Sequence, residues 1–245
     1  MLDQGANPDG IGSGKDWYPP LIALAHRISL NVNYGRESGE ENLRLLGLMK
    51  KLVARGADVN IVAADSRAIP LHHAVEACHR ETVRYLLDQG ARLDPRDYYQ
   101  GATPLARLRD NRNRRDLLAV ARLLVNRGAR LDARDLRGET PLFAIIRSAS
   151  WSPEGVQVME FYLRQGARAD HRNKLGQNTL FLAGFPRQRP ELLRLLLAAG
   201  TALECRDSNR ETPLTYMVKE GTLEGIRMLL KAGADTRAAN RYGVT

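Results

Sequence analysis

The sequence lacks the features that define several protein classes. It has only two cysteines, Cys78 and Cys205, far apart and in no metal-binding pattern. A disulfide framework would need more, so we expect a reducing compartment and a cytoplasmic location. We find no run near the roughly 18 consecutive apolar residues of a membrane helix, and we expect no secretory signal in the opening MLDQGANPDG. Apolar (43%) and charged (27%) contents are those of a soluble globular protein.

Lysine is also scarce, although the chain is basic. The net charge of +9 arises from 31 Arg and 6 Lys against 28 acidic residues. One interpretation is an acidic partner, either a protein or a nucleic acid. The other is a GC-rich genome, which places Arg wherever Lys would serve. Because the acidic residues are mixed through the same segments, the balance alone does not separate the two.

A short phrase recurs along the whole chain. It is a leucine pair, two further residues and Gly-Ala, as in LLDQGAR at residues 86–92. The glycines of this phrase are Gly5, Gly56, Gly90, Gly128, Gly166, Gly200 and Gly233. After a first gap of 51 residues their spacings are 34, 38, 38, 34 and 33. A fixed period of this size indicates a repeat architecture.

A second phrase, typically Thr-Pro-Leu, follows each of these glycines except the last. It includes Thr103-Pro104-Leu105 and Thr212-Pro213-Leu214, with Asn178-Thr179-Leu180 as a variant. Thr or Asn can cap a helix N-terminus, and Pro beside it has its φ already set. Gly after the leucine pair supplies the left-handed residue that ends a helix. Each repeat is therefore predicted to contain two short helices, with apolar stripes that only a neighbouring repeat can cover.

These residues resemble the ankyrin repeat, with its period of about 33 residues and its T-P-L-H-x-A start. Pro70-Leu71-His72-His73-Ala74 and the following residues to Gly90-Ala91 match that pattern most closely. The resemblance covers the chain and implies an all-α ankyrin-repeat solenoid of six stacked helix pairs with hairpin-like connections. We expect one domain over residues 1–245. Its repeats are expected at residues 15–60, 61–94, 95–132, 133–170, 171–204 and 205–237, with partial repeats at 1–14 and 238–245.

Three repeats are longer than the rest. The first carries about sixteen extra residues near Arg27–Asn42, where Ser38 and Glu41 indicate a capping box that restarts the second helix. The third and fourth add four and five residues, around 110–115 and 148–153. We expect all three surpluses in the loop between the two helices, through drift or because such loops carry function, with Trp151 exposed in one. The final pair shows no polar capping face. We therefore expect either a fragment of a longer array, or a C-terminal end that packs against a partner or another copy of the chain.

The resemblance also implies where a partner would bind, along the connection tips and the exposed ends of the first helices. A basic residue precedes the connection Asp or Asn in four successive repeats, with Tyr, Leu and other tip residues beside it, a composition typical of interface hot spots. We call this set the contact row: Arg96, Tyr98, Tyr99, Arg134, Leu136, Arg137, Arg147, Arg172, Lys174, Leu175, Phe185, Arg206, Ser208, Asn209 and Lys219. The alternative is that these basic residues are merely solvated.

The remaining motifs favour structural roles. His72, His73, Cys78 and His79 resemble metal ligands, but repeat geometry explains His72 and His79 and no second cluster completes a shell. A Cys78–His79 nucleophile lacks an orienting third group. The run Arg107–Arg115 is the best nucleic-acid candidate, yet it contains Asp110 and no aromatic residue. We therefore expect no enzyme, metal, cofactor, membrane or small-molecule substrate.

The function predicted from the sequence is that of a scaffold or adaptor. It would bind a protein, preferably one with an acidic surface, along the concave face of the repeats. The alternatives are nucleic-acid binding through the basic surface, or a recognition module of a longer protein whose catalytic domain lies elsewhere.

Overall fold

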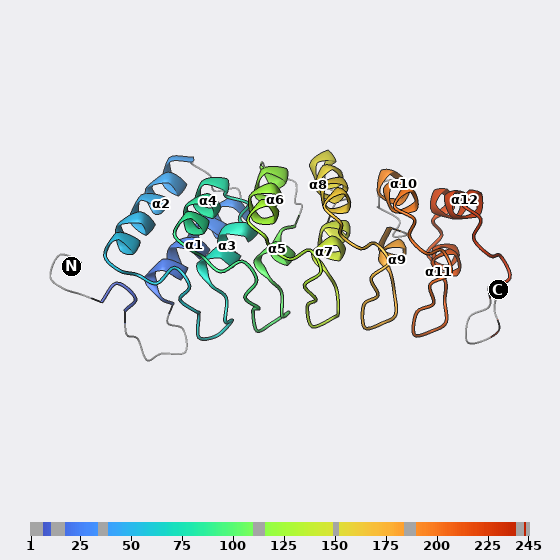
Figure 1. The fold of residues 1–245 in the computed structure, drawn as a ribbon, viewed down its shortest axis with the longest axis horizontal. Coiled ribbons are helices and arrows are strands. Elements are labelled where there is room, and N and C mark those ends of the chain that lie inside the picture. Colours follow the sequence, from blue (N-terminus) through green and yellow to red (C-terminus); the bar gives the residue numbers. More distant parts are fainter. Residues whose placement is uncertain are drawn as a thin grey trace. The chain divides into compact units, whose positions relative to one another are not determined.

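Short helices in consecutive pairs make up the structure, a computed structural model that describes residues 7–10, 18–33, 39–109, 116–148, 152–183, 190–238 and 243. These residues form twelve α-helices, and none of them is assigned to a strand. They divide into two compact units. The N-terminal unit comprises Met1–Leu108 and Arg112–Arg130, and the C-terminal unit comprises Leu131–Thr245 with Arg109–Asn111. Three helix pairs lie in each unit (Figure 1).

The helices of the N-terminal unit pack in sequence order. They are α1 (Pro20–Asn33), α2 (Gly39–Ala54), α3 (Pro70–Glu76), α4 (Arg80–Asp88), α5 (Pro104–Arg107) and α6 (Leu117–Asn126). Helix α3 packs between α1 and α5 and also against α4, and α4 packs against α6. The first helices of the pairs therefore form one layer and the second helices another, with the connections projecting from the first layer (Figure 1).

The C-terminal unit repeats this arrangement. Its helices are α7 (Pro141–Ser148), α8 (Pro153–Arg164), α9 (Thr179–Ala183), α10 (Pro190–Ala198), α11 (Pro213–Lys219) and α12 (Leu223–Lys231). Helix α9 packs between α7 and α11, and α10 packs between α8 and α12. The described residues thus confirm the all-α solenoid of helix pairs.

The helix signals of the sequence act as predicted. The Thr103 hydroxyl caps α5 by accepting from the Ala106 N–H at 3.4 Å, and Thr212 caps α11 by accepting from the Thr215 N–H at 3.3 Å. Six of the phrase glycines follow helices in the left-handed region, with φ between 74° and 95°: Gly56, Gly90, Gly128, Gly166, Gly200 and Gly233. Gly5 lies outside the described residues.

The prediction of where the surplus residues lie is wrong for two of the three long repeats. In the first, α1 has 14 residues and α2 has 16, against 7 and 9 in α3 and α4. Most of that surplus therefore lengthens both helices. In the fourth repeat α8 has 12 residues, so the surplus again extends a helix. Only in the third does it lie between helices, since α5 ends at Arg107 and α6 begins at Leu117. Extra helical turns gain backbone hydrogen bonds and buried surface, which a longer loop does not.

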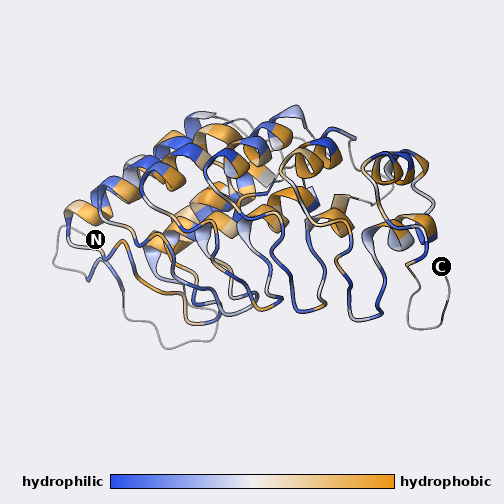
Figure 2. Ribbon diagram, turned by 45° about the vertical axis from the view of Figure 1, so that its right-hand side comes forward, coloured by the Kyte–Doolittle hydropathy of each residue, from blue (hydrophilic) through white to orange (hydrophobic). Residues whose placement is uncertain are grey.

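Apolar side chains from both layers fill the core of each unit. Leu71 and Leu105, which follow the helix-starting prolines, are fully buried in the N-terminal unit. Phe143 and Phe181 are buried in the same way in the C-terminal unit. In Figure 2 the helices carry most of the hydrophobic positions, and the connections are largely hydrophilic. Burial of each large side chain stabilises a unit by about 1.5–3 kcal/mol, before the entropy cost of ordering the chain.

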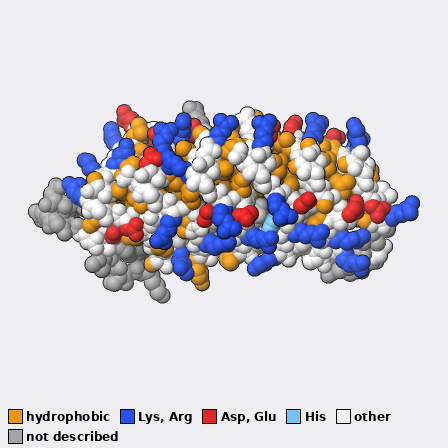
Figure 3. All heavy atoms as spheres, viewed as in Figure 1, with side chains coloured by type: hydrophobic (Ala, Val, Ile, Leu, Met, Phe, Trp, Pro, Cys, Tyr) orange, Lys and Arg blue, Asp and Glu red, His pale blue; other side chains and the backbone are white. Residues whose placement is uncertain are grey.

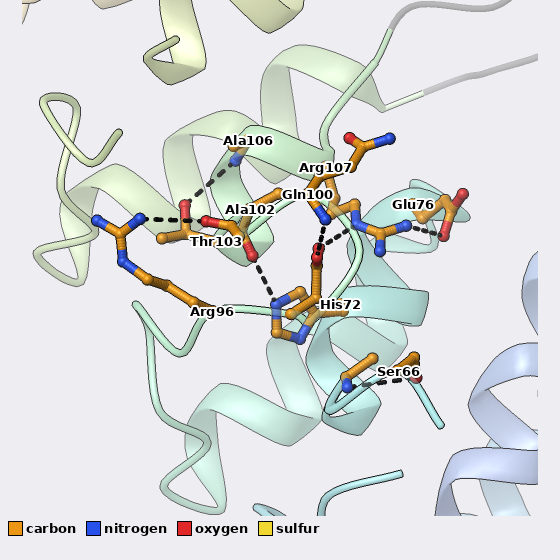
Figure 4. A network of polar contacts seen from close by, with 12 residues as sticks. Ser66, His72, Glu76, Arg96, Gln100, Ala102, Thr103, Ala106 and Arg107 are labelled. Carbon is orange, nitrogen blue, oxygen red and sulfur yellow. Dashed lines mark hydrogen bonds and ion pairs between the residues drawn. The ribbon is translucent and has the colours of Figure 1, made fainter. Parts of the chain in front are cut away.

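A polar network joins two successive repeats of the N-terminal unit (Figure 4). The Nδ1 atom of His72 accepts from the Ile69 N–H, and its Nε2 lies 3.1 Å from the Ala102 carbonyl of the next repeat. Because Nδ1 accepts, Nε2 carries the proton and donates, so the ring is neutral. Burial lowers the pKa of His72 to about 4. The structural role expected for this histidine is confirmed.

Beside this histidine, an arginine links three segments. Arg107 pairs through Nε with Asp97 Oδ2 at 2.8 Å and through Nη1 with Glu76 Oε2 at 3.4 Å. Burial alone would raise the pKa of Asp97, but the Gln100 N–H and the Arg107 guanidinium hold it below its usual range. Arg107, the first residue of the predicted nucleic-acid run, therefore has a structural role. Residues 110–115 of that run lie outside the described residues.

The three connections of the C-terminal unit share one hydrogen-bond scheme. A single side-chain oxygen, on Asp135, Asn173 or Asp207, accepts from the backbone N–H groups two and four residues later at 2.8–3.0 Å. This explains the Asp or Asn of the sequence pattern, since both side chains place an oxygen at this distance. Successive tips also bond to each other: the Lys174 N–H donates to Arg137 O, and the Ser208 N–H donates to Leu175 O, both at 2.8 Å.

The third residue after that Asp or Asn has a positive φ in all three connections. Glycine occupies this position in two of them, where Gly176 has φ +78° and an added Cβ would lie 3.0 Å from the Arg206 carbonyl oxygen. In the third connection Arg210 adopts φ +59°, a conformation that costs a non-glycine residue about 1 kcal/mol.

Exchanging residue types at this position is expected to change stability in opposite directions. Gly176→Ala will lower the free energy of unfolding by about 1–2 kcal/mol, and Arg210→Gly will raise it by about 1 kcal/mol. Urea unfolding followed by circular dichroism measures both. Gly47→Ala in α2 is the matched control: its Cβ meets nothing within 4 Å, and the helix gains from alanine. Equal effects of the two alanine substitutions would contradict this account.

The neutral His72 predicts acid sensitivity. Its pKa is about 4 in the fold and 6.5 in the unfolded chain, so the folded state binds fewer protons below pH 6.5. The stabilisation is complete above pH 6.5 and is lost as the pH falls toward 4, amounting to roughly 2 kcal/mol by pH 5. Urea unfolding at pH 7.5 and pH 5 compares the wild type with His72→Gln, which should lose less. An identical loss in both proteins would refute the assignment.

Candidate interface at the connections

The structure places most of the contact row on the surface. Twelve of its residues are exposed: Arg96, Tyr98, Tyr99, Arg134, Leu136, Arg137, Arg147, Arg172, Lys174, Leu175, Ser208 and Lys219. Arg206 and Asn209 are partly exposed, and Phe185 lies outside the described residues. Since the row extends over both units, each unit is considered by itself.

The C-terminal unit contains a groove between its connections and its first helices. We call it the connection groove, and its volume is about 540 Å³. Ten residues line it: Leu136, Arg137, Glu139, Arg147, Asn173, Lys174, Leu175, Gln177, Leu182 and Tyr216. This volume lies within the range of pockets that hold ligands. Five contact-row residues meet here: Leu136, Arg137, Arg147, Lys174 and Leu175. The row members Arg134, Arg172, Arg206, Ser208, Asn209 and Lys219 do not line it.

Two of the three helix residues that line the groove, Leu182 and Tyr216, form an apolar and fixed part of it. Leu182 of α9 is 2% exposed. Tyr216 of α11 packs on the Phe181 ring, with ring centroids 5.5 Å apart. Burial raises the pKa of the Tyr216 phenol, assisted by nearby Glu220 and Glu211, so the phenol is uncharged at neutral pH. This part of the groove can contact an apolar group at little cost of ordering.

Two basic members of the contact row form ion pairs with their own chain. Arg147 Nη2 lies 2.5 Å from Glu139 Oε1, and Lys219 Nζ lies 3.4 Å from Glu211 Oε1. Both carboxylates are mostly buried, while Arg147 and Lys219 remain 42% and 61% exposed at their side chains. The Asn173 side-chain amide also donates to Glu139. These cations therefore balance buried carboxylates and add little net positive charge.

The other basic residues lie at or near the tips. Within the described part of the chain, the side chains of Arg137, Arg172 and Lys174 have no ion-pair partner. Arg134 Nη2 lies 3.5 Å from His171 Nδ1, and burial lowers the pKa of that histidine, which keeps it neutral beside the guanidinium. Figure 3 shows Lys and Arg side chains gathered over the connections below α7–α12.

In the N-terminal unit the row contributes one aromatic tip. Tyr98 and Tyr99 are 67% and 62% exposed, and their rings meet edge to face with centroids 6.1 Å apart. The Tyr98 N–H donates to Ser66 O of the preceding connection, which fixes the tip. Arg96 beside them donates to the Gly101 carbonyl at 3.3 Å. The tip thus presents two rigid aromatic rings to solvent.

Sequence reasoning missed half of the groove lining. Glu139, Asn173, Gln177, Leu182 and Tyr216 were not singled out. A signal was present for three of them. Leu182 and Tyr216 each lie three residues before a predicted row member, Phe185 and Lys219, and residues three apart share a helix face. For Glu139 the signal was the spacing of eight to Arg147, which recurs from Glu211 to Lys219.

Another of the histidine candidates, His79, serves the helix beside it. His79 caps α4, where its Nδ1 lies 2.8 Å from the Thr82 hydroxyl and 3.4 Å from the Thr82 N–H. Its structural interpretation is confirmed by these contacts. Cys78 is buried with φ +56° in the turn between α3 and α4. No cluster of three metal-ligating side chains occurs among the described residues, and none of their helices has the length and apolar character to cross a membrane.

Comparison with known proteins identifies the repeat. The family model described as "Ankyrin repeats (3 copies)" matches residues 42–135 and 148–240, together more than half of the chain. A comparison with curated proteins gives no match. Ankyrin repeats are generally protein–protein interaction modules, and proteins built from them are typically non-enzymatic. With two family matches and six helix pairs in the described residues, the chain belongs to the ankyrin-repeat family.

Proposed function

We propose that the chain is a scaffold or adaptor that binds a protein with an acidic surface through the connection side of its repeats. The observation that supports this proposal is a difference between the acidic and the basic side chains in the C-terminal unit. Its connection carboxylates are engaged within the chain, whereas several of its basic side chains project outward. The surface left to a partner is therefore more basic than the composition indicates.

Each type of acidic residue in these connections has an internal role. Asp135 and Asp207 hold the turns, and Glu139 and Glu211 pair with helix cations. In two of the three connections, a further acidic residue accepts from a backbone N–H of the next repeat. The carboxylate of Asp170 accepts from the Ala202 N–H at 2.6 Å, and that of Glu204 accepts from the Asp235 N–H at 2.9 Å. Hydrogen bonds from backbone N–H groups reduce the negative potential that these carboxylates present to solvent.

The tips favour a protein over a nucleic acid as partner. Leu136 and Leu175 are 55% and 54% exposed, and Tyr98 and Tyr99 even more. Exposed tyrosine beside arginine is typical of protein interfaces, whose energetic centres combine aromatic and basic side chains. The exposed leucines add apolar surface that a protein partner can cover. A phosphate backbone is bound by cations and hydrogen-bond donors and would gain nothing from the leucines.

Reversing charge at two tips is expected to slow association. The double variant Arg134→Glu/Arg172→Glu should bind a partner captured by crosslinking from the source cell about tenfold more slowly at low salt, with a weaker salt dependence. The reason is that these side chains steer an acidic surface toward the connections. Biolayer interferometry over a salt series measures both quantities.

The control carries the same charge change elsewhere in the C-terminal unit. Arg194→Glu/Arg227→Glu alters exposed arginines of α10 and α12, away from the connections, and should leave association near the wild-type rate. If both double variants slow association equally, net charge alone is responsible and the proposal fails. Tight, salt-sensitive binding to random duplex DNA that the tip variant abolishes would favour the nucleic-acid alternative instead.

The cysteines bear on where this scaffold works. Cys78 and Cys205 are both buried, and neither forms a disulfide. Burial raises the pKa of the Cys205 thiol, which keeps it protonated and unreactive. Two inert thiols are compatible with the cytoplasmic location predicted from the sequence, which stays a prediction.

A further inference from the structure

The connection groove has a shape and polarity that select one kind of segment. We propose that it takes an apolar side chain, aromatic or leucine, from an extended acidic segment of the partner. The apolar side chain would enter between Leu136 and Leu175 toward Tyr216, and flanking carboxylates would meet Arg137 and Lys174. This inference rests on the proposed function and deepens it, because it names the segment that the C-terminal unit recognises.

The walls of the groove are two leucines from successive tips. Leu136 and Leu175 are both more than half exposed, which is unusual for large apolar side chains on neighbouring connections. Leu182 and Tyr216 line the groove from the helices. Burying an aromatic or leucine side chain among these four would remove exposed apolar surface from water on both partners.

The groove is fixed before a partner arrives. The two leucines are carried by tips whose backbones bond to each other, through the Lys174 N–H to Arg137 O and the Ser208 N–H to Leu175 O. Tyr216 is held against Phe181. A rigid site loses little conformational freedom on binding, so its contacts translate more fully into affinity.

The charges of the groove select an acidic segment over a basic one. Its one carboxylate, Glu139, is 9% exposed and is occupied by Arg147 and the Asn173 amide. Arg137 and Lys174 lie at the two tips and are exposed, with no ion-pair partner in the described part of the chain. A segment with carboxylates beside an apolar residue would complement this combination of two exposed cations and an apolar well.

Labelled peptides of one length test separately the apolar residue and the acidic flanks of the proposed segment. The first peptide has a single Phe flanked by Asp and Glu, the second has Ala in place of Phe, and the third keeps Phe but has Lys in place of the acids. Fluorescence polarisation with the full chain should show the first binding at least about tenfold more tightly than the second, equivalent to about 1.4 kcal/mol. The third should bind more weakly than either.

Groove variants test whether binding occurs at this site. Leu175→Asp changes an exposed tip and should remove the preference for Phe over Ala, and Tyr216→Ala should reduce it. The matched controls are Leu43→Asp, a leucine 58% exposed on α2, and Tyr85→Ala on α4. Thermal melts followed by circular dichroism confirm that each variant is folded before its binding is compared.

The outcomes distinguish this inference from the function on which it rests. Two results would show that the groove does not bind an apolar side chain: equal binding of the Phe and Ala peptides, or a preference for Phe that survives Leu175→Asp. Either result would leave the basic tips as the proposed partner site. If no acidic peptide binds while the tip variants still slow association with the protein partner, the groove is again excluded and the proposed function stands. Concentration-dependent dimers in light scattering that Leu175→Asp dissolves would assign the groove to a second copy of the chain.

Discussion

Every feature of this chain depends on one constraint: a pair of short helices cannot bury its own apolar stripe. Helix α3 has seven residues and α5 only four, too few to be stable alone. Within the N-terminal unit α3 is covered on one side by α1 and on the other by α5, and within the C-terminal unit α9 lies between α7 and α11 in the same way. Each repeat therefore buries the apolar surface of its neighbour. For this reason the residues that begin and end the helices must recur in every repeat.

The same constraint determines what is left for a partner. Because stacking requires adjacent connections to approach closely, their backbones bond to each other, and their acidic side chains are used to hold turns and to cap neighbouring N–H groups. Most turn groups that need a partner are N–H donors, which carboxylates satisfy. Arg96 and Arg206 instead donate to turn carbonyls. In the described part of the chain, the tip cations Arg137, Arg172 and Lys174 are not used in this way. A connection surface with outward cations and exposed leucines follows from how the repeats are joined.

How far the candidate site was predictable differs between residues. Leu136, Arg137, Lys174 and Leu175 were predicted from their position beside the turn-forming Asp or Asn, and they do line one groove. Arg147 was predicted on the correct helix face, but its ion pair with Glu139 was not, because that contact joins the end of a connection to the end of a helix. Tyr216 was missed because helix positions were chosen only at the exposed end, although i, i+3 spacing would have added it.

The sequence by itself determined the repeat, the caps and the turns, because these are local: one threonine, proline or glycine acts on N–H groups within a few residues. Only the tertiary structure decided where the surplus residues of the first repeat lie, since lengthening α1 and α2 is stabilised by packing between elements that the spacing does not show. It also decided which charges face outward. Glu139 and Asp135 are chemically alike in the sequence, but one pairs with a cation eight residues away and the other holds a turn. The groove exists because side chains from three repeats meet there, and that meeting is a property of the stacked fold.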